Sequence, residues 1–162
     1  MRRWKLFIGV IAVVVVVIGW YFFRPELLFI DRAVNEQLPA GAASGRATIL
    51  AKGSFRGLAH ETRGAATIYQ LPDGSRTLRL TDFETSNGPD VRVYLVAAPD
   101  AKDNDTVRSA GFIDLGAMKG NKGDQNYEVS AGADLGKYRS VSIWCRRFSV
   151  NFGAAPLSGA NP

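Results

Sequence analysis

The sequence predicts an all-β protein, an antiparallel β-sandwich that follows one N-terminal transmembrane helix. An uncharged run of 18 residues, 6–23, opens the chain. After residue 45, short apolar runs are separated by Gly, Pro, Asp and Asn turn signals about every eight to twelve residues, which is typical of a sandwich. No segment beyond residue 45 has the period of an amphipathic helix. We therefore predict four parts: a transmembrane anchor at 1–24, a juxtamembrane segment and linker at 25–45, a β-sandwich domain at 46–157 and a tail at 158–162.

The run at 6–23 has the length and composition of a membrane span. As a helix it measures about 27 Å, close to a hydrocarbon core of about 30 Å. Its valines leave no polar face, which favours lipid over the interior of a soluble domain. A cleaved signal peptide is the rival interpretation. The nearest small-residue stretch, Ala40–Ala43, lies too far downstream for a cleavage site, so we predict an uncleaved anchor that contacts membrane lipid.

Flanking residues predict the orientation of this helix. Arg2, Arg3 and Lys5 precede the run, and Trp20 and Tyr21 lie near its far end. Basic residues stay on the cytoplasmic side, and aromatic residues favour the membrane–water interface. We expect a single-pass protein of the cell membrane with a cytoplasmic N-terminus and an extracytoplasmic C-terminal domain.

The net charge of +5 reflects this topology. All 15 acidic residues follow Arg24, whereas four of the 20 basic residues lie at or before it. The rest of the chain has 16 basic and 15 acidic residues, a net charge of +1. Because these basic residues are scattered among acids, we expect no nucleic-acid partner.

Downstream of the membrane run, the pattern predicts a short helix, a linker and then strands. Leu27, Ile30 and Val34 share a helical period, and the small residues of 39–45 indicate a linker. Leu78 and Leu80 alternate with polar residues such as Arg79, as in a half-buried strand. We expect a hairpin at 65–83 around the turn at 72–74, a solvated loop at 99–106 and a glycine-rich turn at 119–124. The strands are expected at 46–55, 65–70, 75–83, 91–97, 112–115, 127–129, 141–144 and 148–152.

Cys145, the only cysteine, has two interpretations. It cannot form an internal disulfide, and alternation places it with Val141 and Ile143 on an inward face, where it fills space. The functional alternative needs the strand to end or bulge beside the two arginines that follow, whose charge favours a thiolate. Alternation resumes out of phase at Phe148, so a break of phase occurs between them.

The remaining candidate residues are polar or aromatic. His60, the only histidine, is either a solvated loop residue or a ligand that pairs with Cys145 on a haem or copper. Two residues are too few for structural zinc. Asp82, Asn87 and Asp90 could serve binding or acid–base chemistry, or fold back on their own turn. Trp144 adjoins Cys145 and completes the candidate binding residues, with His60, Asp82, Asn87 and Asp90.

Four ordered blocks resemble the DM-13 domain family, the proposed electron-transfer domain of Skeletor-type proteins. Together they cover about 50–157. The blocks are Gly53-x-Phe55-x4-His60-x3-Gly64-x3-Ile68, Leu80-x-Asp82-Phe83-x3-Asn87-Gly-Pro-Asp-Val-x-Val-Tyr-Leu95, Leu115-Gly-x2-Lys-Gly-Asn-x-Gly-Asp-Gln-Asn-Tyr127 and Tyr138-x-Ser-Val-x-Ile-Trp-Cys-x2-Phe-x-Val-x-Phe-Gly-x-Ala155.

The resemblance implies a fold, a role and a redox residue. The fold is a β-sandwich similar to DOMON domains, and the role is redox chemistry centred on a cysteine that matches Cys145. Animal relatives combine the domain with DOMON and cytochrome-b-type modules. For this chain we expect the electron partner to be another protein or a small molecule. The alternative is a non-catalytic surface binding module that uses the loops at 84–90 and 117–126. In that case Cys145 is a buried core residue.

Overall fold

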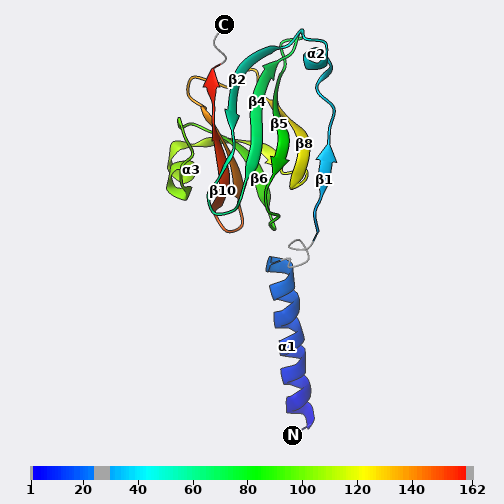
Figure 1. The fold of residues 1–162 in the computed structure, drawn as a ribbon. Coiled ribbons are helices and arrows are strands. Elements are labelled where there is room, and N and C mark those ends of the chain that lie inside the picture. Colours follow the sequence, from blue (N-terminus) through cyan, green and yellow to red (C-terminus); the bar gives the residue numbers. More distant parts are fainter. Residues whose placement is uncertain (1, 24–29, 160–162) are drawn as a thin grey trace.

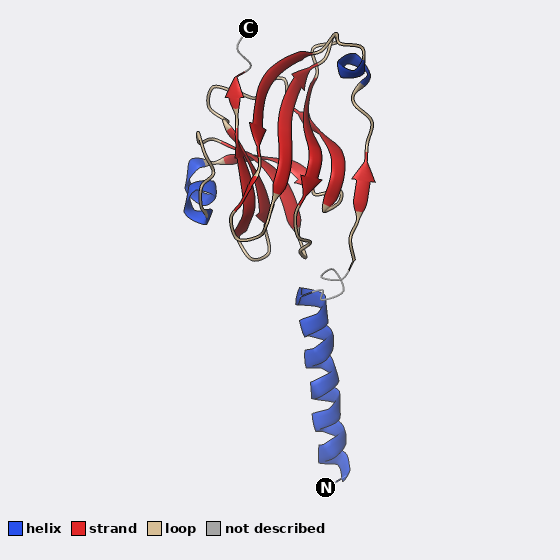
Figure 2. Cartoon of the chain, in the orientation of Figure 1, coloured by secondary structure: helices blue, strands red, loops and turns tan. Residues whose placement is uncertain are grey.

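The computed structural model describes residues 2–23 and 30–159 (Figure 1). A long helix, α1 (Arg2–Phe23), stands apart from two facing β-sheets (Figure 2). The first sheet has the order β1 (Ala33–Asn35), β8 (Lys122–Val129), β5 (Arg76–Glu84), β4 (Arg63–Gln70), β2 (Thr48–Ser54), β11 (Ser158–Gly159). The second has the order β3 (Arg56–Gly57), β10 (Val150–Pro156), β9 (Ser140–Cys145), β6 (Val91–Val96), β7 (Phe112–Ala117).

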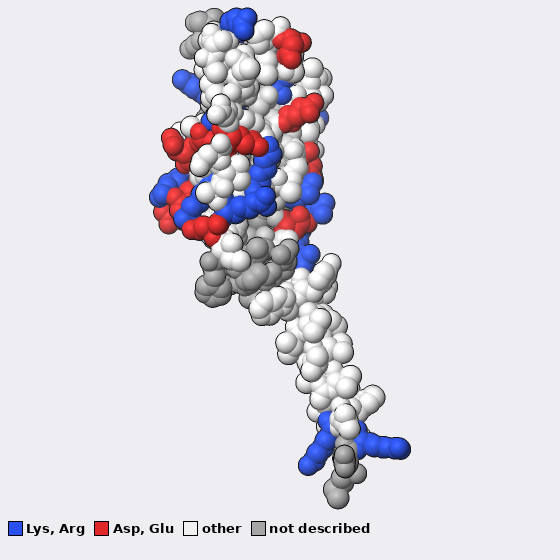
Figure 3. Space-filling model, turned by 90° about the vertical axis from the view of Figure 1, so that its right-hand side faces the viewer, with Lys and Arg blue, Asp and Glu red and all other residues white. Residues whose placement is uncertain are grey.

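The predicted all-β sandwich after one N-terminal helix is confirmed. Every pair of strands is antiparallel except β1 with β8, which is parallel. Helix α1 is long and apolar enough to cross a membrane, and its apolar side chains are exposed. Figure 3 shows it free of charge except for basic residues at the end far from the sandwich.

The predicted hairpin at 65–83 is confirmed as β4 and β5. Its turn follows from local chemistry, because Asp73 Oδ1 accepts a hydrogen bond from the Ser75 amide at 2.9 Å. Gly74 adopts a φ of +85°, which favours glycine over any residue with a side chain. The alternation also places Leu78 and Leu80 as expected, both fully buried between the sheets.

The central strands of the second sheet, β9 and β6, are largely buried on both faces. Its inner face carries Val93 and Ile143 into the core between the sheets. Its outer face carries Tyr94 and Trp144, which pack with Val107 of α3 (Asn104–Ala110). Because helix and sheet cover both sides, all six residues of β9 are buried.

Helix α3 corrects the expectation of a solvated loop at 99–106 and of no helix beyond residue 45. Asp103 caps it, since its side chain accepts a hydrogen bond from the Thr106 amide at 2.7 Å. The helix has seven residues, and only Val107 among them is buried. A single apolar residue gives no periodic signal, which is why the sequence pattern did not indicate it.

Residues 30–38, here called the strap, correct the expectation of a juxtamembrane helix. Of the residues expected in that helix, 26–29 lie outside the described part of the chain. Ala33–Asn35 form strand β1 along the edge of β8, and Glu36 is tied to the domain. Its carboxylate accepts hydrogen bonds from Lys119 Nζ at 2.7 Å and from the Asn126 amide at 2.6 Å. In the segment expected as linker, α2 (Ala40–Ala43) forms one short turn.

The strap explains why Arg79 is buried although the alternation places it on the polar face. Its guanidinium donates to Asp124 Oδ2 at 2.5 Å and to the Glu36 carbonyl at 3.2 Å. Only 4% of Arg79 is exposed. An ion pair with this little exposure is retained because each charge has a partner and further hydrogen bonds.

The phase break after Cys145 is a hairpin turn. Strand β9 ends at Cys145, and β10 begins at Val150, which pairs with Cys145. The turn occupies 146–149, where Ser149 has a φ of +53°. Phe148, which we expected to begin the next strand, is therefore in the turn.

We predict that Gly120→Ala weakens the attachment of the strap. A Cβ at position 120 would collide with the Arg32 carbonyl oxygen and approach Val34 Cγ2 to 2.8 Å. Overpacking of this kind costs about 1–3 kcal/mol. Hydrogen exchange at the Glu36 amide, which donates to the Asp124 carbonyl at 3.0 Å, should become faster.

Gly132→Ala is the matched control, since a Cβ there meets only Ser130 Oγ at 3.8 Å. Equal exchange rates at Glu36 in the two variants would contradict the packing assigned to the strap.

Candidate functional site

Four loops meet at the end of the sandwich that faces α1 (Figure 1), here called the helix-facing end. They are 58–62, 84–90, 117–122 and 146–149. Most candidate residues from the sequence lie in or beside these loops. The first question is what surrounds Cys145, which closes β9 at this end.

Cys145 points into the core, as the alternation predicts. It is a free thiol with 0% exposure, in the same buried cluster as Val141 and Ile143. Its backbone pairs with Val91 on one side and Val150 on the other. Its surroundings are thus those of a small apolar core residue.

The two arginines after Cys145 are engaged elsewhere. Arg146 Nε donates to Asp90 Oδ2 at 2.7 Å, and Arg147 Nη1 donates to the carbonyls of Tyr21 and Phe22 at 3.0 Å each. Among the described residues, none forms a hydrogen bond with the Cys145 sulfur. The strand does end at Cys145, as the functional interpretation requires, but the end of the strand leaves the thiol buried.

A cleft of about 360 Å³ brings His60 and Asn87 together. Charged and polar residues complete its wall, namely Asp31, Glu84, Thr85, Ser86, Asn121 and Lys122. Lys122 Nζ pairs with Asp31 Oδ2 at 2.6 Å across this wall. Hydrogen bonds from Lys122 and Asn121 lower the pKa of Asp31. The cleft is therefore polar and contains charges of both signs.

A second cleft of about 300 Å³ adjoins the first at Asn87 and includes Asp90. Its wall also contains Val91, which is 6% exposed and is the cross-strand neighbour of Cys145. Cys145 itself lines neither cleft and lies beside Val91 on the neighbouring strand, inside the core. Of the six candidate residues, this end of the fold gathers His60, Asn87, Asp90 and Cys145.

His60 is connected to the Cys145 cluster through Phe152. The two rings lie 3.8 Å apart between centroids, and the His60 amide donates to the Phe152 carbonyl at 3.2 Å. Phe152 belongs to the same buried cluster as Cys145. Partial burial lowers the pKa of His60, so the imidazole is neutral at pH 7.

Asp82 and Trp144 lie apart from the clefts. Asp82 is exposed at a bulge of β5, with a φ of +48°, and its amide donates to Asp124 Oδ1 at 3.0 Å. Trp144 is on the opposite face of β9 from Cys145, with its ring centroid 6.3 Å from that of Tyr94. Neither side chain shares a surface with Cys145.

Asn87 and Asp90 do not fold back on their own turn, the structural alternative considered above. Asn87 Nδ2 donates to the Ile30 carbonyl at 2.5 Å, and Asp90 pairs with Arg146. Both bonds join segments more than fifty residues apart in the sequence. These residues hold the strap and the β9–β10 turn in place while they line the clefts.

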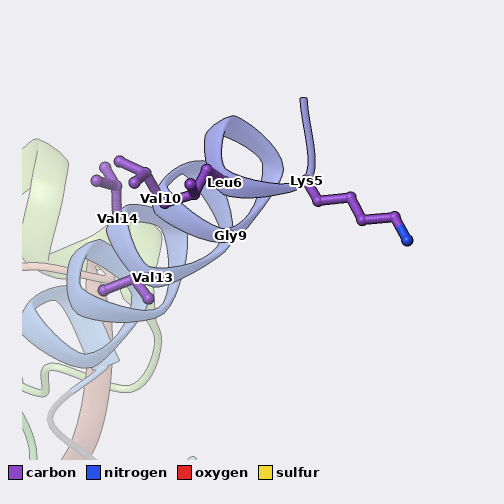
Figure 4. A pocket seen from close by; sticks show the side chains of 6 residues that line it. All are labelled: Lys5, Leu6, Gly9, Val10, Val13 and Val14. Atoms are coloured by element: carbon purple, nitrogen blue, oxygen red, sulfur yellow. The ribbon is translucent and has the colours of Figure 1, made fainter. Parts of the chain in front are cut away.

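Within residues 2–23 and 30–159, no three His, Cys, Asp or Glu side chains are grouped as ligands. A further groove, on α1 around Gly9, is lined by Lys5, Leu6, Val10, Val13 and Val14 (Figure 4). Gly9 has open space beside it, so this groove is a dent in the apolar surface of one helix.

Sequence reasoning missed Asp31 and Lys122 as site residues. They are 91 positions apart, and Asp31 lies in a stretch that we expected to form a short juxtamembrane helix. No local pattern signals such a contact, because the strap reaches Lys122 only when β1 aligns with β8.

We predict that Cys145→Ser destabilises the fold more than Cys145→Ala. Removal of the sulfur leaves a small cavity worth about 1–2 kcal/mol. A serine hydroxyl at the same place has no partner and loses a further 1–3 kcal/mol or so. Denaturant unfolding of both variants, followed by circular dichroism, measures the difference. Equal or greater stability of Cys145→Ser would contradict the apolar surroundings described above.

We predict that His60 makes stability depend on pH. Because burial lowers its pKa in the folded state, the unfolded chain takes up the proton first as the pH falls through about 6.5. Stability should therefore decrease from pH 7.5 to about pH 5.5, and the decrease should be smaller in His60→Gln. Unfolding midpoints at these pH values test this. Identical slopes in the two proteins would contradict it.

Comparisons with known proteins identify the family of this domain. The family model described as "Electron transfer DM13" matches residues 54–157. This range includes Cys145, the β9–β10 turn and the residues of both clefts, apart from those that the strap contributes. No curated protein and no solved structure matches the chain. Since the match covers more than half of the sequence, the chain belongs to the DM13 electron transfer family.

Proposed function

We propose that this protein is a membrane-anchored, extracytoplasmic electron-transfer domain whose redox group is Cys145. Membership of the DM13 electron transfer family carries the proposal. The position of the only thiol beside Val91, which lines the second cleft, supports the choice of Cys145. Helix α1 supplies the anchor, and Arg2, Arg3 and Lys5 keep its N-terminus in the cytoplasm.

Burial of Cys145 selects among redox chemistries. Thiol–disulfide exchange needs a thiolate in contact with a second sulfur, which a fully buried residue does not offer. Transfer of a single electron through the wall at Val91 needs no such contact. The partner is then a one-electron acceptor, protein or small molecule, that occupies the second cleft and is reduced as the Cys145 thiol is oxidised.

The proton of the thiol must leave with the electron. When the neutral thiol gives one electron to the acceptor, its S–H bond breaks, a thiyl radical remains and the proton passes to solvent, so that one proton is released for each electron. The reduction potential should then fall by about 59 mV per pH unit, the value for one proton and one electron.

The burial of Cys145 also favours a second candidate function, a non-catalytic binding module. In this case the clefts at 84–90 and 117–122 bind a partner, and Cys145 fills the core. Clefts of about 300 and 360 Å³ are large enough for a small ligand or a loop of a partner protein. Replacement of Cys145 would then change stability alone.

A redox titration of the full chain in lipid nanodiscs separates the two functions. We predict that film voltammetry of the wild-type protein, recorded at several pH values, shows a redox component. The substitution Cys145→Ala should abolish this component. Ile143→Val is the matched control, because Ile143 lies on the same face of β9 and is equally buried. Its small core truncation should leave the redox component intact.

Two outcomes would contradict the proposal. A redox component that persists in Cys145→Ala would remove the role of the cysteine and leave electron transfer to another group. A chain with no redox component at any potential, but with its ligand bound equally by wild type and Cys145→Ala, would establish the binding module.

A further inference from the structure

The β9–β10 turn contacts the end of the membrane helix. Arg147 Nη1 donates to the carbonyls of Tyr21 and Phe22 at 3.0 Å each, and its guanidinium lies 5.7 and 5.6 Å from the centres of their rings. The Phe148 ring lies 6.0 Å from that of Phe23. The contact thus has a polar and an apolar part, both from one turn.

Arg147 satisfies carbonyls that a helix end leaves without partners. The last four carbonyls of any α-helix lack intrahelical donors, and at the edge of a bilayer water replaces these donors only in part. The C-terminus of a helix also carries partial negative charge, which favours a nearby cation. Within the described residues Arg147 has no carboxylate partner, so its charge is available to lipid phosphate as well.

Phe148 is a large apolar side chain on the surface, 47% exposed. It lies at the level of the aromatic residues that end α1, where Trp20, Tyr21 and Phe23 predict the membrane–water interface. An exposed phenylalanine at this level buries apolar surface only if it enters the lipid. Leu58, 38% exposed in the neighbouring loop, adds to this apolar rim.

Two further arginines lie beside the turn, and each is paired with a carboxylate, Arg108 with Asp105 and Arg146 with Asp90. Arg108 Nη2 donates to the Ser149 carbonyl at 3.1 Å, and Arg146 lies on the other side of Arg147 in the sequence. Arginine next to an exposed aromatic residue is the combination that binds phospholipid at an interface.

We propose that the β9–β10 turn is a second membrane contact, in which Phe148 enters the outer leaflet and Arg147 binds both the end of α1 and lipid phosphate. The proposal rests on the anchor assigned under the proposed function. The second membrane contact holds the helix-facing end of the sandwich, with both clefts, against the bilayer. A single helix would leave the domain free to tilt, and the second contact fixes its orientation.

Spin labels on the full chain in phosphatidylcholine vesicles with an anionic lipid fraction test the proposal. A label at Phe148→Cys should be exposed to oxygen and several-fold less exposed to a water-soluble nickel complex than a label at Ser75→Cys. Ser75 lies in the β4–β5 turn at the opposite end and is exposed. Unsubstituted protein, whose Cys145 is buried, provides the unlabelled blank.

Arg147→Ala in the Phe148→Cys background should raise exposure of the label to nickel. The matched control is Arg139→Ala, an exposed arginine just before β9 at the opposite end, which should leave exposure unchanged. Equal nickel exposure at 148 and 75 would overturn the proposal, provided that the chain resists extraction by alkaline carbonate. Release by carbonate would instead show that the proposed anchor is wrong.

Discussion

Burial of β9 on both faces is the constraint on which the rest of the domain depends. One face closes the core between the sheets, and the other packs under α3 through Trp144. A strand covered on both sides tolerates no charged residue, so the first arginines can follow only where it ends. The end of β9 therefore determines where the turn forms and where Arg147 reaches α1. It also places Cys145 deep in the core, beside the surface loops.

The local parts of this fold could be predicted from sequence, and the long-range parts could not. Alternation placed Val141, Ile143 and Cys145 inward, and Asp73 with Gly74 specified the β4–β5 turn. The strap carries no such signal, because β1 has three residues and its partner strand is about ninety positions away. Burial of Arg79 depends on this same edge strand, so alternation alone assigned it to the polar face.

For the candidate site, too, the sequence predicted single residues but not the long-range contacts between them. Single loop residues such as His60, Asn87 and Asp90 stood out by type, and the fold brings all three to one end. The partners of Asn87 and Asp90, which are Ile30 and Arg146, and the pair of Asp31 with Lys122 were not indicated, since each contact joins two distant segments. The sequence also places two arginines directly after Cys145, which suggested that their charge acts on its sulfur. The backbone turns at 146, and the guanidinium groups extend toward other partners.

The contact between the turn and α1 limits how a partner can arrive. In the membrane contact proposed above, both clefts lie close to the bilayer, and a partner confined to the membrane reaches them by lateral diffusion more readily than one in bulk solution. Encounter then depends on the number of partners per unit of membrane area, and confinement to a thin layer raises their effective concentration. Under these conditions weak binding is sufficient for frequent encounters, and it allows a carrier to be released quickly after each transfer.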